Sequence, residues 1–532
     1  MNFKYIKQIA PAAAMLLTVG LTSCDYLDVT PIDPNDVMEP DEAALYTKCY
    51  ATMALAGNSG ADGDCDIDRL DGGTTGFVRQ MWNVNELTTD EAICAWGDPG
   101  IPDFNFNTYD ASHPMLEGFY NRLYTSIAYC NHYLDVCGGQ DATRTAEVRF
   151  LRAMYYYFLM DCYGNVPFAT ELMATSPSQI QRADLFKWIE SELLDVKDQL
   201  LAPAARKSTD DGYGRADQDA ANLLLARMYL NAEVYTGTAR WADAQEYAEK
   251  VINGPHKLWT NGQNGWSAYQ MLFMGDNGEN GASVEAVLPL LQDGVTTTSY
   301  GTSLYLMASA WKDDMDVDSN YGTTEFWAGN RARSQLLAKF FPGNDAPNIN
   351  IADMVEIAGD DRALFFGIGR DLTVITPTEY TSGYAVGKFR NTYATGGTPH
   401  HTKFVDADYF LMRSAEAYLI AAEADARLHN NVTQTSVGSK YINALRSRAH
   451  ATTNDTYTTR QILDERSREL YWEGFRRTDL IRYGLYHTSD YMWDWKGGAQ
   501  NGAPFSADRC LFAIPSEDLN ANPNLKQNNG YN

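Results

Sequence analysis

Aromatic side chains are the residues of this chain whose type best suits binding chemistry. The 532 residues include 33 tyrosines and 11 tryptophans. Their rings combine an apolar face with a polar tip, which suits stacking on the C–H faces of sugars as well as core packing. Between about residues 257 and 401 the helical period is lost, and the chain fills with Gly, Thr, Asn and aromatics. Because long loops on a rigid scaffold are where binding sites concentrate, we expect the binding site in this region.

Acidic residues are the second abundant type, and their carboxyl groups could serve in catalysis or in metal binding. A glycosidase needs two carboxyl groups at a fixed separation across the scissile bond. None of the 69 acidic residues lies in a motif that indicates this chemistry.

Hard oxygen ligands cluster at Asp276-Asn-Gly-Glu279, with Gln292 nearby in sequence, and this pattern suits a hard cation or a polar turn. His400 and His401 have no cysteine or third histidine nearby, so a solvated loop explains them better than a transition-metal site.

The most strongly charged stretch runs from Glu465 to Gly484. Its charges recur three or four residues apart, as in Glu465/Arg468 and Glu473/Arg476, which is the spacing of neighbours on a helix face. Large aromatic and aliphatic residues interrupt the charges. We therefore expect a helix whose ions are partly buried and paired with one another.

The N-terminus has the pattern of an exported bacterial lipoprotein. Lys4 and Lys7 precede an apolar run over residues 9–21 that is too short to span a bilayer. The run ends in Leu-Thr-Ser-Cys24, which resembles a lipobox, so we expect cleavage to leave Cys24 as the lipidated first residue. Loss of the two lysines takes the formal net charge from −27 to −29, which disfavours nucleic acid as a partner. The other seven cysteines show no pairing pattern, so they predict no disulfide framework.

The remaining sequence predicts a helical scaffold. A helix around 224–232, a turn at Gly237 and a helix over 241–251 resemble a tetratricopeptide (TPR) hairpin, in which small residues let two helices approach closely. A second unit of this kind is expected over Tyr409 to Arg448. Further helices are expected at about 41–55, 114–136, 145–163 and 183–200. The predicted fold class is mainly α, with about four TPR-like helix pairs, long irregular loop insertions and little β structure.

Four motifs occur in a fixed order along the chain. They are Cys24-Asp-Tyr-Leu-Asp; Arg149-Phe-Leu-Arg-Ala with Tyr163-Gly-Asn-Val-Pro; Arg413-Ser-Ala-Glu-Ala-Tyr-Leu; and the charged stretch from Glu465 to Gly484. Together they resemble the RagB/SusD family of surface glycan-binding lipoproteins, and the resemblance covers the whole chain. Other stretches, such as Asn85-Glu-Leu-Thr-Thr-Asp-Glu and Tyr491-Met-Trp-Asp-Trp, resemble its starch-binding members.

The resemblance implies a SusD-like fold and a division of the chain into four parts. The parts are 1–23, a signal peptide that is removed; 24–40, a lipidated N-terminus and tether; 41–256, an N-terminal helical region with TPR-like units; and 257–532, a C-terminal region with glycan-binding loops, a TPR-like unit and a wrapping tail.

The resemblance also implies a site. By local match, Trp96, Tyr300 and Trp327 would form an aromatic arc that cradles the curved face of an α-1,4-glucan. Asp71 and Arg79 would exchange hydrogen bonds with the sugar hydroxyls. The function implied is non-catalytic capture of starch or malto-oligosaccharides.

The cellular setting follows from the same resemblance. The protein would be exposed on the outer-membrane surface through lipid on Cys24 and would deliver its glycan to a SusC-like TonB-dependent transporter. No cofactor is required. Calcium is the structural ion expected at Asp276, Glu279 and Gln292.

Three alternatives stay open. A SusD-like binder of another glycan, such as a fructan or a host glycan, would keep the scaffold and differ in its loops. A TPR-like protein scaffold would use its helical grooves for a partner helix. A glycosidase would need the carboxyl pair that no motif indicates.

Overall fold

The computed structural model describes residues 40–61, 63, 65–173, 175–315 and 321–531. Cys24, the predicted signal peptide and the tether up to residue 39 lie outside the described residues. The described residues from Ala43 onward form one compact unit. Within the described part, no helix has the length and apolarity needed to cross a membrane.

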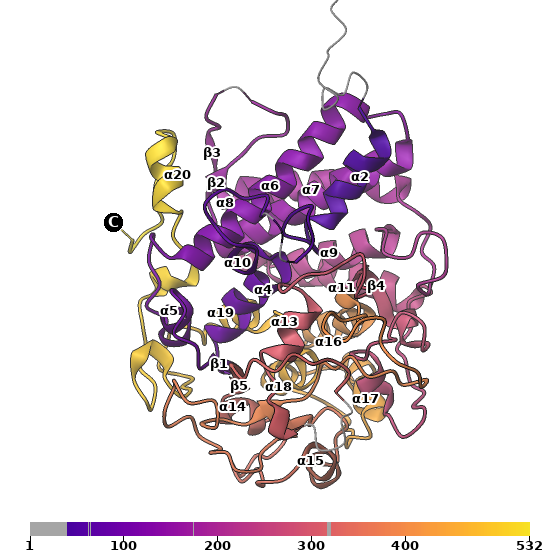
Figure 1. The fold of residues 1–532 in the computed structure, drawn as a ribbon, viewed down its shortest axis with the longest axis vertical. Helices are drawn as coiled ribbons and strands as arrows, with labels where there is room; N and C mark the ends of the chain where they lie inside the picture. Colours follow the sequence, from indigo (N-terminus) through magenta and orange to yellow (C-terminus); the bar gives the residue numbers. More distant parts are fainter. Residues whose placement is uncertain (1–39, 62, 64, 174, 316–320, 532) are drawn as a thin grey trace, which may run out of the picture. The chain divides into compact units, whose positions relative to one another are not determined.

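Helices dominate the described residues (Figure 1). In chain order they are α2 (Glu42–Ala51), α3 (Gly72–Thr75), α4 (Phe77–Trp82), α5 (Ile101–Phe106), α6 (Pro114–Cys137), α7 (Ala142–Cys162), α8 (Arg182–Val196), α9 (Gln218–Leu230), α10 (Ala232–Thr236), α11 (Trp241–Asn253), α12 (Ala268–Met271), α13 (Ser303–Ala308), α14 (Ser334–Leu337), α15 (Ile351–Ala358), α16 (Ser414–Leu428), α17 (Gly438–Arg448), α18 (Thr459–Leu470), α19 (Arg476–Arg482) and α20 (Ser516–Ala521). Between α12 and α16 the helices are short and separated by long loops, as the loss of helical period predicts.

Strands are few and short among the same residues. They form four antiparallel pairs: β1 (Ala92–Cys94) with β5 (Asn330–Ala332), β2 (Val166–Pro167) with β3 (Gln179–Ile180), β4 (Ala286–Leu290) with β8 (Tyr409–Arg413), and β6 (Phe365–Phe366) with β7 (Ala385–Val386). The prediction of a mainly α fold with little β structure is confirmed.

The long helices begin where the sequence supplies caps. Asp141 accepts a hydrogen bond from the Arg144 backbone N–H at the start of α7, and Asp217 caps α9 in the same way. In α11, Ala244 and Ala248 are fully buried where this helix packs against α9 and α16. This packing is compatible with a helix hairpin, and the TPR-like description stays a prediction.

The predicted helical unit starting at Tyr409 is wrong at its beginning. Tyr409–Arg413 is strand β8, which pairs with β4, and α16 starts only at Ser414. Leu, Met and Arg favour helices locally, but all five strand residues are buried, and pairing with β4 satisfies their backbone groups. Tertiary contacts override helix propensity here.

The charged stretch from Glu465 to Gly484 is two helices and not one. Helix α18 ends at Leu470, and Trp472 and Gly474 have φ angles of 67° and 82°, so the chain turns before α19. The Gly474 N–H donates to the Glu86 carboxylate (2.7 Å), which fixes the turn. The predicted pair Glu465–Arg468 forms at 2.7 Å.

Arg476 pairs with a carboxylate far away in sequence and not with Glu473. Its Nε lies 2.6 Å from Asp90 Oδ1, and both side chains are buried. The expectation that ions of this stretch are buried and paired is therefore confirmed, although Arg476 has a different partner from the one predicted.

Buried ions form a network at the centre of the C-terminal half. Arg413 is 1% exposed in its side chain and touches three glutamates, at 2.8 Å from Glu285, 2.7 Å from Glu469 and 2.7 Å from Glu473. Neighbouring arginines outweigh burial and hold the pKa of Glu469 well below its usual range. These residues belong to the short 3-10 helix that ends at Glu285 just before β4, to β8, to α18 and to the turn before α19, so the network joins distant segments.

All seven cysteines of the described residues are free thiols. Five of them are buried, namely Cys49, Cys94, Cys130, Cys137 and Cys162. The absence of a disulfide framework among them agrees with the prediction from their spacing.

Candidate functional site

Strand pairing positions the first predicted ring. Strand β1 pairs with β5, with Cys94 opposite Asn330, and the Ala95 N–H continues the ladder to the Gly329 carbonyl (2.9 Å). Trp96 therefore follows directly after the pair. Its indole N–H donates to the Trp327 carbonyl (3.2 Å), which joins the two predicted tryptophans across 231 positions of sequence.

The three predicted aromatic residues lie together in the structure. The ring centroids of Trp96 and Trp327 are 6.5 Å apart, and those of Trp327 and Tyr300 are 6.1 Å apart. Successive rings are inclined by 53° and 51°. Each ring is half-buried, so part of its surface remains open to a ligand.

The close approach of two glycines places Tyr300 beside the N-terminal segment. A Cβ on Gly76 would lie 3.1 Å from the Gly301 Cα, and the Gly301 carbonyl accepts a hydrogen bond from the Arg79 N–H (3.0 Å). Side chains at either glycine would separate the two backbones. The segment that carries Asp71 and Arg79 is thereby held against the loop of Tyr300.

Asp71 and Arg79 lie at one edge of this arc. Asp71 caps α3, accepting hydrogen bonds from the Thr74 N–H (2.9 Å) and hydroxyl (2.7 Å). Burial acts against ionisation, but these hydrogen bonds and the nearby Arg79 charge lower the pKa of Asp71, so it is an anionic acceptor at neutral pH. The Arg79 guanidinium lies 5.0 Å from the Tyr305 ring centroid and 5.9 Å from that of Trp96.

Sequence reasoning missed residues that extend the arc. The Phe404 ring lies 5.6 Å from Tyr300, and the His401 ring lies 5.3 Å from Phe404. Lys403 Nζ donates to the Tyr300 hydroxyl (2.5 Å). Glu325 accepts the Trp327 indole N–H (2.7 Å). The only signal in the sequence was the presence of these residues in or next to the aromatic-rich loops.

The predicted cation ligands line one cleft of about 440 Å³. Asp276 accepts hydrogen bonds from the backbone N–H groups of Ala394 (3.0 Å) and Thr395 (2.9 Å), so both of its oxygens have protein donors. Glu279 accepts from a serine hydroxyl (2.9 Å), and Gln292 from a threonine hydroxyl (2.8 Å). Carboxylates suit calcium, but no group of three His, Cys, Asp or Glu able to hold a metal occurs in the described parts of the chain. Calcium stays a prediction.

The same cleft contains Asp408, a buried carboxyl group whose pKa is raised. Burial raises the pKa of Asp408 to about 7.

Of the two histidines considered for a transition metal, His400 pairs through Nδ1 with Asp406 (2.9 Å), and His401 Nδ1 accepts backbone N–H groups. Both therefore have structural roles in their loop.

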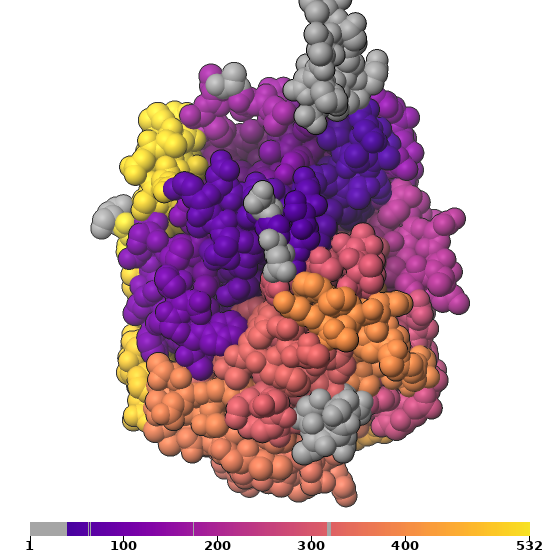
Figure 2. Space-filling model, in the orientation of Figure 1, coloured from indigo at the N-terminus to yellow at the C-terminus, as the bar shows by residue number. Residues whose placement is uncertain are grey.

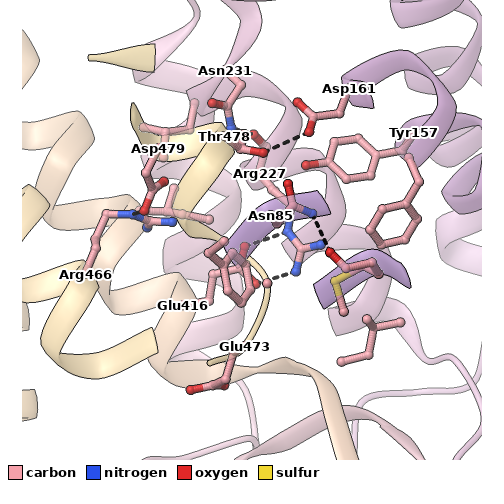
Figure 3. A pocket seen from close by; sticks show the side chains of 17 residues that line it. Asn85, Tyr157, Asp161, Arg227, Asn231, Glu416, Arg466, Glu473, Thr478 and Asp479 are labelled. Carbon is pink, nitrogen blue, oxygen red and sulfur yellow. Dashed lines mark hydrogen bonds and ion pairs between the residues drawn. The ribbon is translucent and has the colours of Figure 1, made fainter. Parts of the chain in front are cut away.

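A smaller cavity of about 30 Å³ lies among buried charges, where α7, α9, α16, α18 and α19 meet (Figure 3). It has room for one or two waters. Its ions are already paired: Arg227 with Glu416 (2.6 Å) and Arg466 with Asp479 (2.7 Å). Asp161 accepts the Thr478 hydroxyl (2.8 Å). This cavity fits a role in packing and does not fit a sugar.

Comparison with known proteins identifies the family. The model of the SusD family matches residues 223–531, and a model described as "Starch-binding associating with outer membrane" matches residues 25–230. The starch-binding protein SusD of Bacteroides thetaiotaomicron is 37% identical over 571 aligned positions, covering 100% of both chains.

Solved structures show the same fold. A SusD superfamily protein from Parabacteroides distasonis superposes with a TM-score of 0.68 at 18% identity, covering 92% of this chain and 98% of the other. Surface glycan-binding protein A from Bacteroides fluxus gives 0.66 at 18% identity, with 93% and 100% covered. The resemblance found in the motifs is therefore confirmed, and this chain belongs to the SusD family.

Proposed function

We propose that this protein is a non-catalytic binder of starch and malto-oligosaccharides that works at the outer-membrane surface. The observation that carries the proposal is the arc of Trp96, Trp327 and Tyr300, three half-buried rings from separate segments with centroids 6.5 and 6.1 Å apart. Similarity to the starch-binding relative over the full length supports the choice of glycan.

The shape of the arc favours a curved glycan. The rings are inclined to one another by 53° and 51°, so they cannot stack on a flat ribbon together. Successive sugar faces turn along an α-1,4-glucan, whereas a β-1,4-glucan is extended. A ligand with turning faces can therefore meet the three rings one after another.

Hydrogen bonds within the protein determine which groups of the arc remain free to contact a sugar. Both indole N–H groups are engaged, Trp96 with the Trp327 carbonyl (3.2 Å) and Trp327 with Glu325 (2.7 Å). The ring faces are therefore the main contact surface, and stacking supplies most of the affinity. Asp71 as acceptor and Arg79 as donor would orient the sugar through its hydroxyls.

The setting of the protein follows from its family and its N-terminus. The lipobox ending at Cys24 supports a lipid anchor, and the family model over residues 25–230 carries the description of outer-membrane association. We propose that the glycan passes to a SusC-like TonB-dependent transporter. Copurification of such a transporter with the tagged full-length protein from its own membranes would test this step.

Binding to a panel of oligosaccharides tests the glycan. Calorimetry should show binding of maltoheptaose, and neither a cello-oligosaccharide nor a fructan should bind. A triple variant with alanine at Trp96, Tyr300 and Trp327 should lose binding while its melting temperature changes little. Trp241→Ala removes a half-buried tryptophan of α11, whose ring packs against Arg427 of α16, and serves as the control.

Two outcomes would contradict the proposal. Unchanged binding by the triple variant would remove the arc as the site, and exclusive binding of another glycan would support the alternative specificity. Prolonged incubation of maltoheptaose with the pure protein should yield no shorter products. Their appearance would instead indicate a glycosidase.

A further inference from the structure

We propose that the arc continues beyond Tyr300 into a further sugar subsite built by Phe404 and His401, so that the protein distinguishes long glucans from short ones. The inference rests on the proposed function. The Tyr300 and Phe404 centroids are 5.6 Å apart with the rings inclined by 53°, close to the 51° between Tyr300 and Trp327. Phe404 therefore adds a fourth inclined ring next to Tyr300.

The turn that carries these residues is held against the arc. The Thr324 N–H donates to the Thr402 carbonyl (2.9 Å), and the Thr323 hydroxyl donates to the Lys403 carbonyl (2.7 Å). Both threonines precede Trp327 by only a few residues. The position of the turn is thus fixed relative to the segment that carries Trp327, and such pre-organisation lowers the entropic cost of binding.

A buried carboxylate fixes the other side of the turn. Asp406 is 7% exposed and accepts hydrogen bonds from the His400 N–H (3.0 Å) and the Tyr393 hydroxyl (3.0 Å). Its own N–H donates to Asn391 (2.8 Å). Figure 2 shows the orange segment near residue 400 on the same face as the coral segment near residue 300.

His401 supplies a donor of defined direction. Its Nδ1 accepts the backbone N–H groups of Lys403 (3.0 Å) and Phe404 (3.1 Å). In the neutral ring this assigns the proton to Nε2, which makes Nε2–H a donor. The residue is exposed, so Nε2–H can reach a sugar hydroxyl.

Lys403 orients the Tyr300 ring, which lies between the Trp327 ring and the Phe404 ring. Its Nζ donates to the Tyr300 hydroxyl (2.5 Å) and lies 4.7 Å from the Tyr300 centroid and 5.6 Å from that of Phe404. The cation thus spans the junction of the two rings. A glucan long enough to pass Tyr300 would meet Phe404 as a stacking face and His401 as a hydroxyl donor.

The test is the ratio of affinities for maltoheptaose and maltotriose, measured by calorimetry on the full chain. A short glucan can be held by Trp96, Trp327 and Tyr300 alone, so wild type should bind maltoheptaose more tightly. Phe404→Ala should weaken maltoheptaose binding by about tenfold, the loss expected for one stacked face, and change maltotriose binding little. His401→Ala, at an exposed position, should give a smaller loss in the same direction.

Matched controls separate this effect from general destabilisation. Phe505 is also half-buried and packs on Tyr486 at 5.1 Å in the C-terminal tail, and His450 is also exposed. Phe505→Ala and His450→Ala should leave the ratio at its wild-type value. Melting temperatures of all four variants identify any that fold poorly, and His401→Ala keeps the test open if Phe404→Ala does not fold.

The outcomes distinguish this inference from the proposed function. If wild type binds neither sugar, the proposed function fails, and the subsite with it. If wild type binds both but Phe404→Ala and His401→Ala keep the wild-type ratio, or lower both affinities equally, the subsite is refuted while the three-ring arc stands.

Discussion

Gly329 offers a way to move one ring of the arc without changing the ring itself. A Cβ at this position would lie 2.2 Å from Cε2 and 2.5 Å from Cζ2 of Trp96. Since carbon atoms rest about 3.5–4.0 Å apart, alanine must push the indole away by about 1.5 Å. If this removes about 60 Å² of contact with a sugar face, the loss is about 1.5 kcal/mol, or about tenfold in Kd.

Gly97→Ala is the matched control, because a Cβ there meets no heavy atom within 4 Å although the residue adjoins Trp96. Calorimetry with maltoheptaose should show the tenfold loss for Gly329→Ala and none for Gly97→Ala. Tryptophan fluorescence should report the moved indole, and the melting temperature should show that the fold persists. Full affinity in a Gly329→Ala protein whose indole has moved would refute the role assigned to Trp96.

Three further predictions concern stability. Arg413→Leu removes one buried cation that three buried glutamates share and should cost about 3–5 kcal/mol in urea unfolding, whereas Arg69→Ala removes an exposed pair and should leave the midpoint unchanged. Burial raises the pKa of Glu91 from 4.5 to about 7, so the folded protein keeps a proton that the unfolded chain releases. Stability should therefore fall as pH rises from about 4.5 to about 7, and Glu91→Gln should flatten this fall in urea titrations at pH 5 and 7. Asn528→Ala leaves two buried carbonyls without the donor that now lies 2.7 Å from each, and should cost about 1–3 kcal/mol in the same assay.

The helical scaffold was predictable because its signals are local. Caps such as Asp141 and the small residues of α11 can be recognised in a short window of sequence. The turn at Trp472 and Gly474 could not be predicted in this way. It depends on Glu86, nearly 400 residues earlier, and no proline marks it.

The candidate site was predictable only in part, and through resemblance. Aromatic residues mark the loops, but nothing in their spacing says that Trp96 meets Trp327, since β1 and β5 must pair first. Phe404 and His401 escaped prediction for a related reason. Their turn has no periodicity, and hydrogen bonds from Thr323 and Thr324 bring it to the arc.

The order in which the buried ions occur along the chain constrains when the molecule can fold. During translation Arg413 is synthesised after Glu285 but before Glu469 and Glu473. In the folded protein these four side chains form one buried network. A nascent chain that stops short of α18 would bury an arginine lacking two of its three counter-ions, a state that low dielectric strongly disfavours. Assembly of the C-terminal half must therefore wait until nearly the whole polypeptide has been synthesised, and shortened products should remain open to proteases.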